Sequence, residues 1–212
     1  SDVYKRQVGG WTGEGGAELG TRREVPNTRD LYAVSRALED NHIDALLVIG
    51  GYSAYEGIYT MTTERDRYPA FRIPTVCIPA SIDNNLPGSE LSIGADSALN
   101  VIVEAMDKVK ESGIASRRCF VVETMGRDCG YLALMSGIAA GAERIYTNED
   151  GISLDDLAND VHWLRESFAH GRRLFLAVRN ENASHNYTTD FIARLLEEES
   201  HGMYDVRQVV LG

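Results

Sequence analysis

The sequence has few of the residues that cross-link small extracellular domains or build metal clusters. Its 212 residues include only three cysteines, Cys77, Cys119 and Cys129, and no two of them form a Cys-x-x-Cys pair. We therefore expect neither a disulfide framework nor a zinc cluster, and the composition favours a reducing, cytoplasmic location. The five histidines lack the spacing of metal ligands, so we interpret them as surface residues and expect no bound metal.

Long apolar runs and an excess of positive charge are also absent. The longest uncharged stretch, residues 129–142, is broken by glycines and is shorter than the ~18–20 residues that a membrane-spanning helix needs. With 21 basic and 32 acidic side chains, the formal net charge is −11. This balance argues against bulk nucleic-acid binding, and we expect neither a nucleic-acid nor a membrane partner.

Short apolar runs alternate with helical patterns along the chain. The runs predict strands at 45–49, 75–79, 119–123, 144–147, 174–178 and 209–211. Apolar stripes predict helices around 31–38, 98–109, 132–142, 154–168 and 188–200, with Thr28 and Ser153 as N-caps. This alternation predicts an α/β fold with a parallel sheet covered by helices, a three-layer, Rossmann-like arrangement. Ligands of such sheets bind beyond the carboxyl ends of the strands.

Several of the expected loops carry groups that could bind a phosphate or a sugar. The glycine-rich stretch 9–23 suggests a phosphate cradle but fails the common nucleotide-binding patterns, so a surface loop remains the alternative. The segment 81–88 could use Asp83 to accept a proton from a sugar hydroxyl, or could simply be a turn.

Two more loops add possible binding groups. Met125-Gly126-Arg127 follows a strand, and backbone amides at the next helix start could hold an anion. Glu181 follows another strand and could bind sugar hydroxyls or pair with an arginine. Arg118 lies at the opposite end of its strand, so it is either a surface charge or serves a site on a neighbouring subunit.

Taken in order, these motifs resemble those of the ATP-dependent 6-phosphofructokinase family. The segments GGWTG, LLVIGGY, IPASIDNNLPGSE, IGADSALN, VVETMGRDCGYLA, LAVRNE and NYTTDFI carry the resemblance. They are most similar to the carboxy-terminal, regulatory half of the double-length eukaryotic enzyme, in a fungal-like form. Residues 9–212 would be an interior fragment of that half, with the phosphofructokinase fold incomplete at both ends, and residues 1–8 remain unmatched. The resemblance implies an enzyme of glycolysis that phosphorylates fructose 6-phosphate to fructose 1,6-bisphosphate.

Two departures from the family's catalytic pattern bear on what this segment does. The nucleotide site of the catalytic half carries Gly-Gly-Asp-Gly-Ser, whereas this chain has Gly50, Gly51 and Tyr52. The second acid of the catalytic loop is replaced by Asn85, although Asp83 is retained as a vestigial base. Tyrosine cannot replace a carboxylate that handles Mg²⁺. We therefore expect Mg-ATP to bind in the other half, and this segment alone to be inactive.

The sugar-phosphate side of the site is better preserved. By resemblance, the effector fructose 2,6-bisphosphate would be bound by Arg23, Ser81, Ile82, Asp83, Asn84, Asn85, Arg118, Met125, Gly126, Arg127, Glu181 and Arg207. A guanidinium group can donate two parallel hydrogen bonds to the oxygens of a phosphate. The resemblance also implies that Arg118 reaches into the site of a partner subunit. The full-length protein would be a homo-oligomer, a tetramer or larger.

Two other functions stay open. Asp83 and Arg127 also resemble a catalytic half, so the chain could be a phosphofructokinase domain that binds fructose 6-phosphate, with Asp83 as base. It could also be a structural half that only builds the oligomer.

Overall fold

We describe the protein from a computed structural model. It describes residues 10–13, 15–18, 20–21, 24–27 and 29–212. The chain divides into two compact units, one of Ser1–Leu46 with Ser53–Val76 and one of Leu47–Tyr52 with Cys77–Gly212. Among the described residues, none of the helices is long and apolar enough to cross a membrane.

The smaller unit is built from short helices around a small apolar core. It contains the 3-10 helices η1 (Trp11–Gly13) and η2 (Pro69–Arg72) and the α-helices α2 (Asp30–Asp40) and α3 (Tyr52–Thr63). Its core is formed by Leu31, Met61 and Phe71, with Val34 and Leu38 packed against them. Leu31, Val34 and Leu38 lie on one face of α2, as their spacing predicts. Strands β1 (Leu46–Gly50) and β2 (Thr75–Pro79) pair as a two-stranded sheet, and most residues of both strands belong to the larger unit.

The larger unit contains a parallel four-stranded sheet. Its strands are β3 (Arg118–Thr124), β4 (Arg144–Tyr146), β5 (Leu174–Asn180) and β6 (Asp205–Leu211), in the order β4-β5-β3-β6. The register pairs Arg118 with Leu174 and Asp205, and Thr124 with Asn180. The three longer strands therefore begin and end level with one another, so their loops emerge at common edges.

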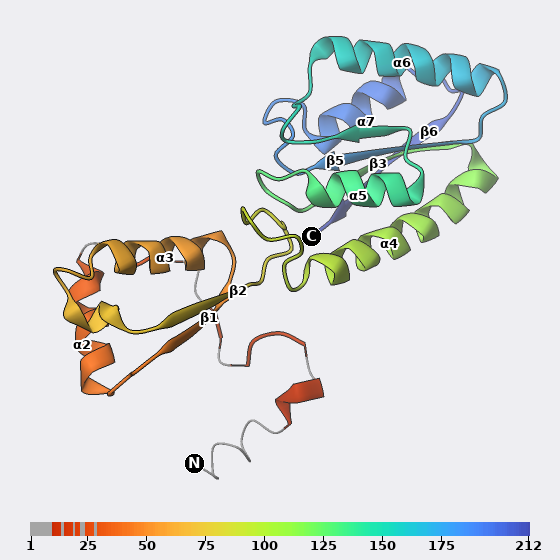
Figure 1. Ribbon diagram of the computed structural model, residues 1–212. Helices are drawn as coiled ribbons and strands as arrows, with labels where there is room; N and C mark the ends of the chain where they lie inside the picture. Colours follow the sequence, from red (N-terminus) through yellow and green to blue (C-terminus); the bar gives the residue numbers. More distant parts are fainter. Residues whose placement is uncertain (1–9, 14, 19, 22–23, 28) are drawn as a thin grey trace. The chain divides into compact units, whose positions relative to one another are not determined.

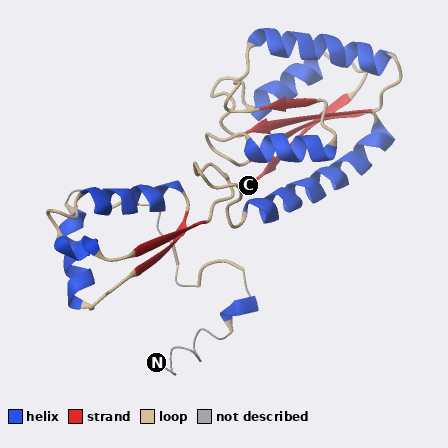
Figure 2. Cartoon of the chain, viewed as in Figure 1, coloured by secondary structure: helices blue, strands red, loops and turns tan. Residues whose placement is uncertain are grey.

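Helices cover both faces of this sheet (Figures 1 and 2). On one face, α4 (Ala95–Ser116) and α5 (Tyr131–Ala140) pack on alternate strand residues such as Phe120 and Val122. On the other face, α6 (Leu154–Ala169) and α7 (Thr189–Glu198) pack on the residues between them, such as Cys119 and Val121. The three-layer α/β arrangement predicted from the sequence is confirmed.

The structure changes several of the predicted elements. Helix α3 was not predicted, because its sequence YSAYEGIYTMTT mixes glycine, threonine and tyrosine without a clear apolar stripe. Strand β6 begins four residues before the predicted start, at Asp205, and β5 continues to Asn180. The Ser153 cap is confirmed: Ser153 and Asp156 form a reciprocal capping box at the start of α6. The Thr28 cap lies outside the described residues.

Candidate site at the carboxyl edge of the sheet

The predicted binding residues of the larger unit lie at two opposite edges of the sheet. Arg118 is the first residue of β3, and Arg207 is the third residue of β6, opposite Phe120. The loop that follows β3 instead starts at Met125, beside the end of β5. Since β3 has 7 residues, its two ends are ~20 Å apart. Within one chain, the structure therefore separates Arg118 and Arg207 from Arg127 and Glu181.

Arg118 and Arg207 both have local hydrogen-bond partners. The Arg118 guanidinium donates from Nη1 to the Ser112 hydroxyl at 3.2 Å, while its Nε is buried without a hydrogen-bond partner. Arg207 donates from Nη1 to the Val206 carbonyl at 2.8 Å. Arg23, the remaining predicted arginine, lies outside the described residues.

At the carboxyl edge, Glu181 is fixed against the loop that follows β3. Its Oε1 accepts hydrogen bonds from the backbone amides of Gly126 at 3.1 Å and Arg127 at 2.8 Å. The Glu149 carboxylate accepts from the amide of Gly130, with both oxygens, at 2.9 and 3.0 Å. These amides, which the sequence suggested as an anion site, already bind carboxylates of the protein. The two hydrogen bonds to Oε1 fix the Glu181 carboxylate against the loop.

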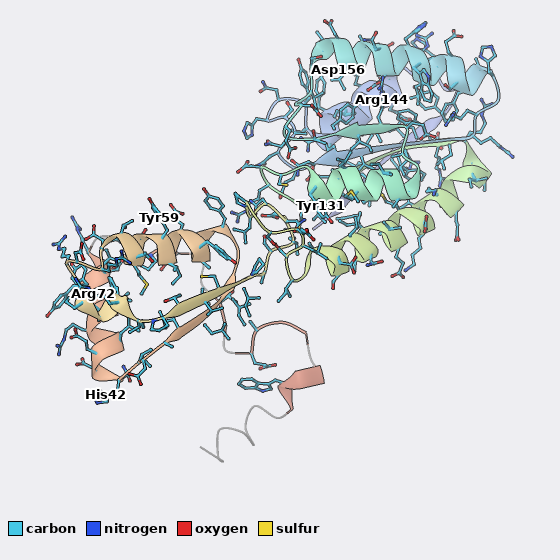
Figure 3. The ribbon with its side chains drawn as sticks, viewed as in Figure 1. His42, Tyr59, Arg72, Tyr131, Arg144 and Asp156 are labelled. Carbon is cyan, nitrogen blue, oxygen red and sulfur yellow. The ribbon has the colours of Figure 1, made fainter. Side chains whose placement is uncertain are left out.

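The 126–130 loop needs an unusual backbone. Gly126 has a φ of 135° and Arg127 a φ of 47°, a region that side-chain-bearing residues seldom adopt. A Cβ at Gly126 would lie 2.5 Å from the Cys129 carbonyl oxygen and 2.9 Å from Nδ2 of Asn180. Asn180 is fully buried and donates to that same carbonyl at 3.2 Å. The loop ends at Tyr131, the first residue of α5 (Figure 3).

The 81–85 loop approaches the 126–130 loop. Burial raises the pKa of the Cys129 thiol, and the charges of Glu149 and Asp83 raise that pKa further. Asp83 is therefore close enough to Cys129 to act on it electrostatically. Gly51 also abuts this loop, because a Cβ there would lie 3.2 Å from the Cβ of Ser81.

Two side chains of the 81–85 loop form hydrogen bonds with nearby backbone groups and so stabilise its conformation. Ser81 Oγ accepts from the amide of Asp83 at 3.2 Å. Asn84 has a φ of 51°; its Oδ1 accepts from the amide of Ser92 at 2.8 Å, and its Nδ2 donates to the Glu90 carbonyl at 3.2 Å. Asn84 therefore folds the loop. Ile82 packs on the core under α4, and Asn85 is exposed.

The nucleotide segment does not fit a magnesium-bound nucleotide. Gly50 ends β1, and Tyr52 begins α3 with 59% of its surface exposed. Its phenol is not the hard carboxylate oxygen that Mg²⁺ prefers. No group of three or more His, Cys, Asp or Glu residues could hold a metal ion within the described part of the chain.

Arg179 lies inside the protein rather than in a ligand-facing loop. It is 2% exposed, and its guanidinium donates to Glu123 at 2.6 Å, to the Thr189 hydroxyl at 3.1 Å and to the Ser184 carbonyl at 2.8 Å. Glu123 also accepts a hydrogen bond from Thr189. These bonds tie β3 to the start of α7 and to the loop that carries Glu181.

Sequence analysis missed the residues that support the 126–130 loop, namely Asn148, Glu149, Asn180 and Asn182. Each bonds to the loop through its side chain. Two polar runs in the sequence could have indicated these residues. Thr-Asn-Glu-Asp follows β4, and Arg-Asn-Glu-Asn spans the end of β5 and the loop after it.

A parallel sheet with helices on both faces and polar loops at its carboxyl edge defines a doubly wound α/β protein, a class whose ligands bind beyond the carboxyl ends of the strands. The phosphofructokinase family model matches residues 1–212, and the chain belongs to this family.

Known relatives and solved structures agree with this assignment. The chain is 46% identical over 206 residues to the platelet-type ATP-dependent 6-phosphofructokinase of Rattus norvegicus, covering 97% of this chain and 26% of that protein. It is 45% identical to the ATP-dependent 6-phosphofructokinase of Dictyostelium discoideum, covering 97% of this chain and 25% of that protein. The structure of phosphofructokinase from Saccharomyces cerevisiae superimposes with a TM-score of 0.88 at 38% identity, covering 93% of this chain and 27% of that one. The chain thus spans about a quarter of the length of these relatives.

Proposed function

We propose that the chain is part of an ATP-dependent 6-phosphofructokinase, a cytoplasmic phosphotransferase of glycolysis, and that this part binds fructose 2,6-bisphosphate as an allosteric effector. Family membership and the names of the relatives support the parent activity. The observation that carries the effector role is the Glu181 carboxylate. It is held by the amides of Gly126 and Arg127, in a loop whose Cys129 feels the charge of Asp83.

Charge decides how such a ligand is held. A sugar bisphosphate carries ~3–4 negative charges near neutral pH. At the carboxyl edge it would meet the carboxylates of Asp83 and Glu181, and the loop amides that could have bound phosphate are occupied by Glu149 and Glu181. The negative charge of the phosphates must therefore be compensated by guanidinium groups, and Glu181 accepts hydrogen bonds from the sugar hydroxyls.

Arg118 and Arg207 fit this need as residues of a second copy, because in its own chain Arg118 starts β3 and Arg207 lies four residues before the carboxyl end of β6. A ligand that bridges two subunits favours the quaternary state in which both arginines reach it, and so shifts the equilibrium between states. Activation of the catalytic half follows from that shift.

The test is calorimetric titration of the protein with fructose 2,6-bisphosphate, fructose 6-phosphate and Mg-ATP. We expect the bisphosphate to bind and Mg-ATP not to bind. Measurable Mg-ATP binding would favour the catalytic alternative, with Asp83 as base. Absence of any sugar-phosphate binding would leave only a structural role in the oligomer.

Mixing variants tests whether the site is shared between subunits. Arg127→Ala and Arg118→Ala should each weaken binding when present in all subunits. In a mixed dimer, one site carries both changes and the other carries neither, so mixing the two variants should restore tight sites. If mixing restores nothing, Arg118 does not act across the interface.

A further inference from the structure

The 126–130 loop is held from both sides by side chains of neighbouring loops. From the loop after β5, Asn180, Glu181 and Asn182 bond to it, as described above. From the loop after β4, Asn148 Nδ2 donates to the Asp128 carbonyl at 3.0 Å, and Glu149 accepts from the amide of Gly130. The β4 side of this support is not part of the effector site proposed above.

The loop depends on this support because its own backbone supplies little. Within the loop, a backbone hydrogen bond runs from the Cys129 amide to the Gly126 carbonyl at 2.9 Å. Gly126 and Arg127 adopt positive φ, which costs ~1–3 kcal/mol for a residue with a side chain unless the surroundings hold it.

Glu149 is placed closely against the loop backbone. A Cβ at Gly130 would lie 2.5 Å from Oε2 of Glu149 and 2.6 Å from the Cβ of Thr147. The carboxylate also lies at the start of α5, where the helix dipole favours negative charge. The side chain of its neighbour Asp150 bonds within its own turn, accepting from the Thr147 hydroxyl at 2.8 Å.

We propose that Glu149 and Asn148 are positioning residues for the effector site. They fix the 126–130 loop so that Arg127 reaches the ligand phosphate and Glu181 keeps its amide partners. This inference rests on the proposed function for its ligand. The conformational part concerns the loop itself and can be measured without any ligand.

Electrostatics and positioning predict opposite signs for the same substitution. Glu149→Ala removes a negative charge near an anion site, which on charge alone tightens bisphosphate binding. It also removes the acceptor of the Gly130 amide, which loosens the loop and weakens binding. Glu149→Gln removes the charge but keeps an acceptor oxygen. Asp150→Asn removes a neighbouring charge without touching the loop, and serves as the matched control.

The experiment measures two quantities on these variants and on Asn148→Ala. The first is the hydrogen-exchange rate of the Gly130 and Arg127 amides, followed by NMR without ligand. The second is the calorimetric affinity for fructose 2,6-bisphosphate. For Glu149→Ala and Asn148→Ala we expect ~3–10-fold faster exchange and ~3–10-fold weaker binding, because each variant loses one hydrogen bond to the loop. Glu149→Gln and Asp150→Asn should match or exceed wild-type affinity, with exchange close to wild type.

The outcomes separate this inference from the proposed function. If the wild-type protein does not bind the bisphosphate, the proposed function fails, and the exchange rates still decide whether Glu149 and Asn148 hold the loop. If exchange in Glu149→Ala equals that of wild type, the positioning role is overturned. If Glu149→Ala binds more tightly than wild type, the charge of Glu149 matters and its hydrogen bond does not, which also overturns the role. Glu149→Gln preserves the hydrogen bond and so keeps the test valid if the alanine variant folds poorly.

Discussion

Removing the buried guanidinium of Arg179 should destabilise the larger unit strongly. Arg179→Met keeps the bulk of the side chain but deletes its bonds to Glu123, Thr189 and Ser184. Breaking a buried ion pair by removing one partner costs ~3–5 kcal/mol, because the other charge is left without compensation. The Glu123 side chain retains 22% exposure, so water offsets part of that cost and we expect ~3 kcal/mol. For a protein of this size, that loss lowers the melting temperature by ~6–12 °C.

The assay is urea unfolding and thermal melting followed by circular dichroism. Arg194→Met is the control, because Arg194 pairs with Asp190 at 3.0 Å with its side chain 80% exposed. Such a surface pair contributes at most ~0.5 kcal/mol. The double variant Arg179→Met/Glu123→Gln also removes the negative charge that Glu123 keeps when Arg179 is gone. It should recover part of the lost free energy of unfolding. The reasoning is refuted if Arg179→Met costs no more than Arg194→Met, or if the double variant recovers nothing.

Three further outcomes are expected. Ser153→Ala should cost ~1 kcal/mol in urea unfolding. Hydrogen bonds from Ser153 hold the pKa of Asp156 (labelled in Figure 3) below its ordinary value. The stability that the ionised Asp156 contributes is therefore present at pH values above its pKa in the unfolded chain, and it is lost as the pH falls through its pKa in the folded protein. The difference from wild type should therefore be larger at pH 6 than at pH 3, and equal differences would contradict the capping role. Asp83→Asn should lower the pKa of Cys129 and speed its alkylation by iodoacetamide at pH 8, measured by mass spectrometry; an unchanged rate would mean that Asp83 does not act on this thiol. Gly126→Ala should cost ~2 kcal/mol and expose the amide of Arg127 to exchange, because its Cβ would collide with the Cys129 carbonyl; wild-type stability would refute the clash.

The sequence predicts the elements of the larger unit well because burial there follows a simple period. In the middle of β3 and β5, residues 119–122 and 175–178 are apolar and buried by helices on both faces, so the runs are visible directly. The ends of the strands are harder to predict. Arg179 and Asn180 are polar, which suggests a loop, yet both are buried and continue the ladder of β5. Their partners Glu123 and Cys129 lie about fifty residues away and leave no local pattern.

The residue types of the candidate site can be predicted, but the partners of those residues cannot. The sequence places Ser81, Asn84 and Glu181 in loops at the carboxyl edge, and the structure agrees. It does not reveal that Asn84 is used by the backbone of residues 90 and 92, or that Glu181 binds the loop amides. A hydrogen bond between distant loops depends on the register of the strands that carry them, which no spacing in the sequence encodes.

The occupied amides link ligand binding to assembly. In the described part of the chain, Arg127 is the only one of the predicted arginines at the carboxyl edge, whereas Arg118 starts β3 and Arg207 lies within β6, opposite Phe120. A ligand with two phosphates would then gain most of its charge compensation from a second copy. Binding that requires two copies depends on protein concentration, and the ligand in turn stabilises the assembly by mass action. The apparent affinity for the bisphosphate should therefore rise with protein concentration, whereas a site completed within one chain would show no such dependence.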